Sequence, residues 1–203
     1  MKLFILACTF IVPAAAWADF NDELCNDNAS LAACGVAAVN WDAKPREFET
    51  RFSDHFKNRS VGEYGFYVSF LNEMITEDNP YYYHPVGEFS VTTAMDEEDC
   101  LVTRITTPAL TPSAPIFVCK PLAERAAVAV AQVSWRTWRS DSKIEVKKSR
   151  QISATSKKEV YSVSVAMLPK EGVDVKLSKG KFKVTVAKHP SDGRCVVTEV
   201  LKK

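Results

Sequence analysis

The chain is poor in the motifs from which many catalytic sites are built. Seven glycines in 203 residues leave little material for a phosphate-binding loop. The sequence contains no G-x-S-x-G, H-E-x-x-H or C-x-x-C pattern. This argues against a nucleophile elbow, a zincin helix, a cysteine-built zinc site and a thiol–disulfide oxidoreductase. These absences lower the expectation of an enzyme without excluding one, because catalytic triads assemble from residues distant in sequence.

Long apolar runs are also scarce. Residues 3–12 form a largely apolar run behind Lys2, and no later segment resembles a membrane span. The run is shorter than the roughly 20 apolar residues of a spanning helix, which disfavours the alternative of an uncleaved anchor. Residues 16–18, Ala-Trp-Ala, have the form of a signal-peptidase site. We therefore expect residues 1–18 to be a cleaved signal peptide and the protein to be exported, either periplasmic or secreted.

The near-neutral net charge of +1 conceals an opposition between the two halves of the chain. Residues 19–100 carry 17 acidic and 5 basic residues, a net charge of −12. Residues 101–203 carry 20 basic and 8 acidic residues, a net charge of +12. Such asymmetry predicts contact of the basic half with a polyanion or a membrane surface. The alternative is that the acidic half folds onto the basic half and cancels its field.

Residues 19–80 have a pattern typical of helices. Phe48, Phe52 and Phe56 recur every four residues behind Pro45, and this spacing predicts one apolar helix stripe. Residues 60–63, Ser-Val-Gly-Glu, have the form of a capping box and predict a second helix ahead of the proline at 80.

From residue 86 the pattern changes to period two, which predicts antiparallel strands up to residue 203. Apolar residues alternate over 173–177 and 182–186 and predict a hairpin with a turn at 178–181. Its lysines, at 176, 181 and 183, fall on the face opposite the apolar residues, so one side of the hairpin should be cationic. A further turn is expected at 189–193.

Residues 122–138 fit either an alanine-rich helix or a strand, and we favour a strand for their second half. No repeat or flexible linker divides the chain, so we expect residues 19–203 to form a single α+β domain. Its N-terminal helices should pack on one face of a curved antiparallel sheet. This order of elements resembles cystatin-like and NTF2-like shapes, and the resemblance concerns the fold alone.

Five cysteines follow residue 18, and an oxidising compartment should pair most of them. Cys100 and Cys119 flank two short β-branched runs, whose antiparallel pairing would place these cysteines opposite each other. Such a bridge would stabilise the fold by about 3 kcal/mol. Cys25 and Cys34 lie nine positions apart and predict a second bridge at a helix corner. Cys195 is then expected as a buried thiol, the alternatives being an intermolecular bridge or a different pairing.

The basic half contains a candidate binding surface in which aromatic and cationic residues interleave. It consists of Trp135, Arg136, Trp138, Arg139, Lys147 and Lys148. Basic residues among aromatic rings bind anionic groups and stack on rings. Export makes nucleic acid a poor candidate partner, and an anionic envelope polymer or lipid headgroup a better one. The alternative is that the tryptophans belong to the core and the charges serve solubility.

A second candidate is the proline-rich segment at residues 106–116, with Leu110 and Pro112 near its tip. A stiff loop costs little entropy to order on binding, which suits the recognition of a protein partner. The third candidate is the aromatic segment at residues 79–88, where His84 follows three tyrosines. His84 is the one histidine in an unusual setting, and the rest of the segment is typical of an aromatic corner.

Metal and cofactor sites are not expected. The acidic run at residues 96–99 lacks the spaced D-x-D-x-D-G form of a calcium loop, and a solvated turn explains it equally well. The sequence therefore favours an exported, non-catalytic domain that binds a protein or an anionic envelope component. The alternative is a hydrolase or small-ligand domain with a pocket between helices and sheet near His84.

Overall fold

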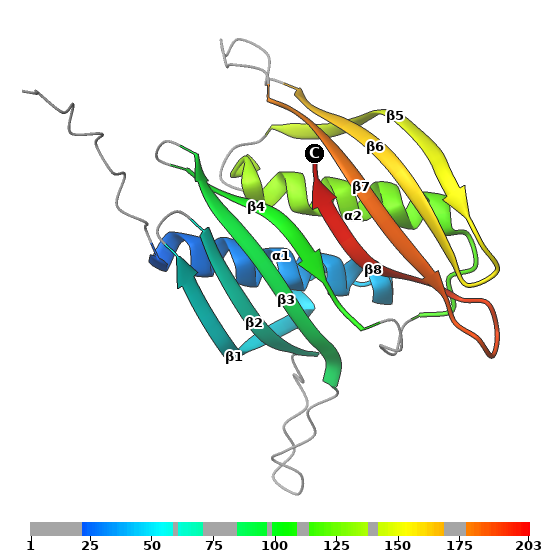
Figure 1. Ribbon diagram of the computed structural model, residues 1–203, viewed down its shortest axis with the longest axis horizontal. Helices are drawn as coiled ribbons and strands as arrows, with labels where there is room; N and C mark the ends of the chain where they lie inside the picture. The colour runs from blue at the N-terminus through cyan, green and yellow to red at the C-terminus, as the bar shows by residue number, and fades with distance from the viewer. Residues whose placement is uncertain are drawn as a thin grey trace, which may run out of the picture.

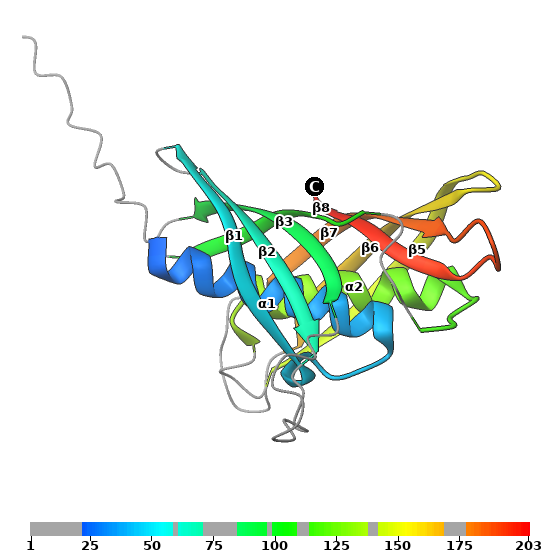
Figure 2. The ribbon, with the colours of Figure 1, turned by 90° about the horizontal axis from the view of Figure 1, so that it is seen from below.

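The computed structural model describes residues 22–58, 61–70, 85–96, 99–108, 114–137, 142–168 and 178–203. In this part of the chain, two α-helices lie side by side against one face of an eight-stranded antiparallel sheet that is not closed (Figures 1 and 2). The expected α+β fold, with helices on one face of an antiparallel sheet, is confirmed. Neither α-helix combines the length and the hydropathy that crossing a membrane requires.

The strands are joined in the order β1-β2-β3-β4-β8-β7-β6-β5. The elements are α1 (Asp22–Trp41), the short 3-10 helix η1 (Pro45–Glu47), β1 (Phe48–Asn58), β2 (Val61–Phe70), β3 (Pro85–Asp96), β4 (Asp99–Thr106), α2 (Cys119–Ser134), β5 (Lys143–Ala154), β6 (Lys158–Leu168), β7 (Lys179–Lys188) and β8 (Cys195–Lys202).

The two halves of the chain have the same architecture. A helix is followed by a meander of four antiparallel strands, first as α1 with β1 to β4 and again as α2 with β5 to β8. The two meanders join edge to edge at β4 and β8, which leaves β1 and β5 as the edges of the sheet (Figure 1). The expectation that no repeat divides the chain is therefore wrong at the level of architecture.

An approximate two-fold axis passes between β4 and β8 and relates the halves. Ile105 pairs with Val200 at the centre of this junction. From these two residues outward, the pairing between successive strands follows the same register in both halves. Thr92 on β3 and Thr185 on β7 hold corresponding places, and each is followed directly by a β-bulge. Residues of one half can therefore be matched to residues of the other by their strand pairing.

Each helix is fastened to the central strand of the opposite half. The Asn40 side chain on α1 donates to the carbonyl of Val197 on β8 (3.1 Å) and accepts from the amide of the same residue (2.8 Å). At the matching place on α2, the Ser134 hydroxyl accepts from the amide of Val102 on β4 (3.2 Å). All of these groups are buried, so the contacts hold both halves in one body.

We predict that Asn40→Ala lowers the free energy of unfolding by about 2–3 kcal/mol, because it leaves two buried backbone groups of Val197 without partners. Ser134→Ala is the matched control and should cost less, since it removes one bond. Urea denaturation followed by circular dichroism measures both, with the m-value expected to stay unchanged. Equal stability of Asn40→Ala and the unmutated protein would contradict this role.

The disulfides are Cys25–Cys100 and Cys119–Cys195, and Cys34 is free and buried. Each bridge joins the N-terminal part of a helix to the start of the last strand of its own half, with sequence separations of 75 and 76. In the chain-entropy model, closing loops of this length contributes about 4.5 kcal/mol per bridge. The bridges are thus a further feature that the two halves share.

The expected pairings Cys25–Cys34 and Cys100–Cys119 are therefore wrong, as is the free thiol at Cys195. Cys25 and Cys34 lie on one helix, where nine residues separate Cα atoms by about 13 Å, beyond the reach of a disulfide. Cys100 is on β4, whose neighbours are β3 and β8, and the segment before Cys119 forms no strand.

Burial raises the pKa of the Cys34 thiol to about 11, because the thiolate would be formed in an apolar environment. We predict that iodoacetamide at about pH 8 leaves Cys34 unmodified in the folded protein and modifies it rapidly after unfolding without reductant. Peptide mapping by mass spectrometry identifies the modified residue and both bridges. Rapid labelling of Cys34 in the folded protein would contradict its burial.

The helices expected over residues 45–56 and 60–75 are wrong. Pro45 begins only the short η1, and β1 and β2 follow. A spacing of four is also an even number, so Phe48 and Phe52 fit one face of a strand as well as one stripe of a helix. On β2 the buried side chains alternate strictly, from Tyr64 through Phe66 to Val68. The part of the second expected helix beyond residue 70 lies outside the described residues.

The strand favoured within residues 122–138 is also wrong, because α2 extends to Ser134. The apolar residues of this alanine-rich segment fit both the alternation of a strand and the spacing of a helix. The length of the segment and its packing against α1 and the sheet favour the helix. The strand expected at residues 116–118 is absent as well, and Phe117 and Val118 are exposed.

The alternation expected in the last third of the chain is confirmed on β6 and β7, where Tyr161, Val163, Phe182 and Val184 are buried. The turn expected at residues 178–181 is wrong, since β7 begins at Lys179. Residues 173–177 lie outside the described residues. The turn at residues 189–193 is confirmed and closes through a hydrogen bond from the Gly193 amide to the His189 carbonyl (2.8 Å).

Candidate functional site on the helix-free face of the sheet

Among the described residues, no helix covers one face of the sheet, and two features distinguish this face. We call it the outer face. Side chains alternate along a strand, so the neighbours of buried Phe182 and Val184 on β7 point to the outer face. Lys181 and Lys183 are these neighbours, which confirms the cationic side expected for this hairpin at the two lysines that are described.

Two strands further, β5 brings more cations to the same face. We define the basic patch as Lys148, Arg150, Lys181 and Lys183. Ser164 on β6 pairs with Lys148 on one side and Lys181 on the other, and Ser162 lies in the same way between the other two cations. The patch therefore consists of two parallel rows, each with a hydroxyl between two positive charges.

The spacing of the patch follows from sheet geometry. Cations of one row are two strands apart, about 10 Å, and the rows are two residues apart, about 7 Å. Lys148, Arg150 and Lys181 are exposed and Lys183 is partly buried. None of the four forms an ion pair with another described residue.

The acidic group nearest to these rows on β5 already has a partner. Glu145 forms an ion pair with Lys147, which occupies the β-bulge between Val146 and Lys148. This pairing removes one carboxylate from competition for the patch. The arrangement is suited to bind several anionic groups at once, with hydroxyls as additional hydrogen-bond donors.

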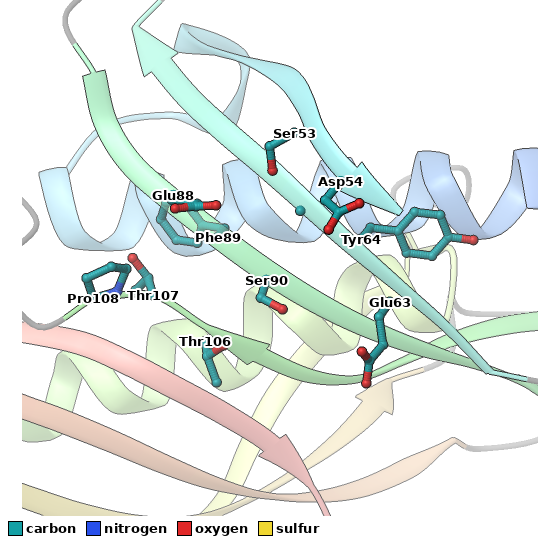
Figure 3. A pocket seen from close by; sticks show the side chains of 11 residues that line it. Ser53, Asp54, Glu63, Tyr64, Glu88, Phe89, Ser90, Thr106, Thr107 and Pro108 are labelled. Atoms are coloured by element: carbon teal, nitrogen blue, oxygen red, sulfur yellow. The ribbon is translucent and has the colours of Figure 1, made fainter. Parts of the chain in front are cut away.

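The corresponding area of the first half contains a groove of about 510 Å³ over β1 to β4 (Figure 3). Its polar lining is rich in carboxyl and hydroxyl groups: Ser53, Asp54, Glu63, Glu88, Ser90, Thr106 and Thr107. Gly65 forms part of the floor, where an added Cβ would lie 2.4 Å from the Ser53 hydroxyl, so the bulge of β1 requires a glycine opposite it. The groove is therefore negatively charged, in contrast to the basic patch.

A second cavity, of about 430 Å³, lies on the other side of the molecule between α1 and α2. Its lining combines small side chains with the polar side chains of Glu124, Arg125 and Gln132. Gly35 approaches Ala129 closely enough that a Cβ would lie 3.3 Å away. Neither this cavity nor the groove on the outer face is enclosed between the helices and the sheet.

The clearest pKa shifts occur away from the basic patch. Hydrogen bonds from Lys188 and Tyr161 hold the pKa of the Glu159 carboxyl below its usual value. Burial, followed by the hydrogen bond to Glu159, raises the pKa of the Tyr161 phenol. Burial also lowers the pKa of Lys202. Glu159 and Tyr161 lie on β6 and Lys202 near the end of β8, all outside the basic patch.

The interleaved aromatic and basic segment does not join the basic patch. Trp135 contacts Gly180 on the helix-covered side of the sheet, where an added Cβ would lie 3.0 Å from its ring. Arg136 forms an ion pair with Asp99 at 3.2 Å. Lys148 lies on the opposite face. Binding roles of Trp135, Arg136, Lys147 and Lys148 stay predictions, and only Lys148 lies in the patch.

Other candidate residues lie outside the described part of the chain, namely His84, Leu110, Pro112, Trp138 and Arg139. Within the described part, no three histidine, cysteine or carboxylate side chains gather as metal ligands would. The sequence did not predict the serines between the cations. It also did not predict that β5 and β7 contribute to one surface. Alternation in both strands is visible in the sequence, and only the strand order brings them to one surface.

No protein-family model and no curated protein matches the sequence. Among solved structures, the chain is similar to one described as "Ntf2 like protein involved in plasmid conjugation". The two share 12% sequence identity over 76% of each chain, with a TM-score of 0.24. At this TM-score the likeness carries no argument about function.

Proposed function

We propose that the protein is an exported, non-catalytic binding domain that recognises an anionic component of the cell envelope. The basic patch is the site of recognition. The partner carries repeated anionic groups, phosphate or carboxylate, along an extended polymer. The basic patch carries this proposal, because it places four cations without described partners in two regular rows on a face that none of the described helices covers.

Repetition in the partner follows from the shape of the patch. A single small anion contacts one or two cations, whereas rows about 7 Å apart and 10 Å long suit successive charges of a chain. Binding several charges at once releases several counterions and gives a strong dependence on salt. The serines between the cations supply hydroxyl donors to oxygens that bridge or flank the charges.

Export is supported by the disulfides. Both bridges join elements far apart in sequence, and such structural disulfides are typical of oxidising compartments. The envelope is the compartment in which an exported chain meets anionic polymers. Protein recognition by Leu110 and Pro112, and pocket chemistry at His84, stay predictions.

We predict that Lys181→Gln with Lys183→Gln weakens binding to a long polyphosphate at least about tenfold, because half of the patch charges are lost. The measurement is a binding titration on the exported chain with both disulfides intact. Affinity for the polymer should fall steeply between about 0.05 and 0.2 M NaCl, and inorganic phosphate alone should bind far more weakly.

Lys44→Gln with Arg46→Gln is the matched control. It removes the same charge at η1, outside the patch, and should leave the affinity within about twofold. An equal loss of polymer affinity in the two double variants would show that only net charge matters. This result would refute a specific patch. Tight binding that is indifferent to salt would refute the electrostatic mechanism itself.

A further inference from the structure

The internal two-fold axis places the acidic groove and the basic patch at equivalent positions. By strand register, Asp54 on β1 corresponds to Arg150 on β5. Asp54 pairs with Gly65 on β2, and Arg150 pairs with the equivalent residue of β6, Ser162. In the same way Glu88 on β3 corresponds to Lys181 on β7. The face thus carries two equivalent areas of opposite charge.

We define the acidic patch as Asp54, Glu63 and Glu88, all of which line the groove in Figure 3. Glu63 and Glu88 are exposed, and neither forms an ion pair with a described residue. The inversion of charge is not complete. The counterpart of Lys148 is Arg51, at the edge of the acidic patch, that of Lys183 is Ser90, and that of Glu63 is Val160. The net sign of each area is nonetheless clear.

This arrangement makes the outer face complementary to itself. The two patches lie at equal distances from the junction of β4 and β8, because an axis through that junction relates them. Consider a second copy turned by 180° about a line that lies in the face, passes through the junction of β4 and β8, and is perpendicular to the line joining the two patches. Its acidic patch then lies over the basic patch of the first copy, and its basic patch over the acidic one. A closed two-fold dimer requires such a self-complementary surface.

We propose that two copies of the chain associate through their outer faces, with the acidic patch of each against the basic patch of the other. Eight strands about 4.8 Å apart make a face about 34 Å wide, which suffices for the roughly 800 Å² per partner of a standard interface. Both patches are polar and hydrated, so the association is reversible and sensitive to salt. This inference goes beyond the proposed function, and either can fail without the other.

Sedimentation velocity of the disulfide-bonded chain at about 0.02 M and 0.5 M NaCl tests the pairing. We expect a dimer at low salt, with a dissociation constant at least about tenfold higher at high salt. Two patch-reversed variants are compared with it. The first, Glu63→Lys with Glu88→Lys, makes both patches basic. The second, which combines Lys148→Glu, Arg150→Glu, Lys181→Glu and Lys183→Glu, makes both acidic. Each variant alone should stay monomeric at low salt.

A mixture of the two variants gives the decisive result. Equal amounts should form a one-to-one heterodimer, because every contact again joins opposite charges. The variant that combines all six substitutions should recover the homodimer. Circular dichroism verifies that each variant is folded. A monomer at low salt for the unmutated chain, or homodimers of the single-patch variants, would overturn the proposal, as would failure of folded variants to form the heterodimer.

Binding of polyphosphate separates this inference from the proposed function. The variant with the reversed acidic patch keeps all four cations of the basic patch, so it should bind the polymer at least as tightly as the unmutated chain. A chain that binds polymer but never pairs refutes only the dimer. Failure of this monomeric variant to bind the polymer refutes only the proposed function, because no second copy covers its basic patch.

Discussion

The junction of β4 with β8 is the contact on which the remaining structure depends. Its pairing covers only three residue pairs, with Ile105 opposite Val200 at the centre, far fewer than the pairings within either meander. So short a ladder needs support from elsewhere. Asn40 and Ser134 provide it, because each helix bonds to the central strand of the other half, and the close approach of Gly35 to Ala129 allows the helices to lie together.

Matched positions of the two halves differ in how strongly the fold constrains their side chains. Matched positions on the helix-covered side keep their character, such as Tyr64 with Tyr161 and Phe89 with Phe182, all of them buried. These side chains fill the core beneath the helices, where a change in volume is costly. Matched positions on the outer face are not packed beneath a described helix, so substitution there costs little stability. The two halves therefore share a core and differ in surface charge.

The sequence predicted the class of fold and the strands of the last third, but not the strands of the first half. Phe48, Phe52 and Phe56 satisfy helical and strand periods together, and only the neighbouring strand β2 decides between them. The disulfides were unpredictable for a related reason, since cysteine spacing carries no information on which distant elements adjoin. Lysines at 181 and 183 were recognised as a cationic face, because alternation within one strand is a local property. Their combination with Lys148 and Arg150 depends on strand order, which local patterns do not contain.

The arrangement of charge decides between the two interpretations of the acidic and basic halves. The halves lie side by side in one sheet, not face to face, so direct contacts between their charges are few. Among the described residues, Arg125 pairs with Asp42 at 2.6 Å and Arg136 with Asp99 at 3.2 Å, and Arg104 pairs with Glu199 at the junction at 2.9 Å. The centres of the acidic and basic patches are five strand spacings apart, about 24 Å. This is more than twice the screening length of about 8 Å at physiological salt. Each patch therefore presents its own field to a partner, and a chain with almost no net charge can still bind by electrostatic attraction.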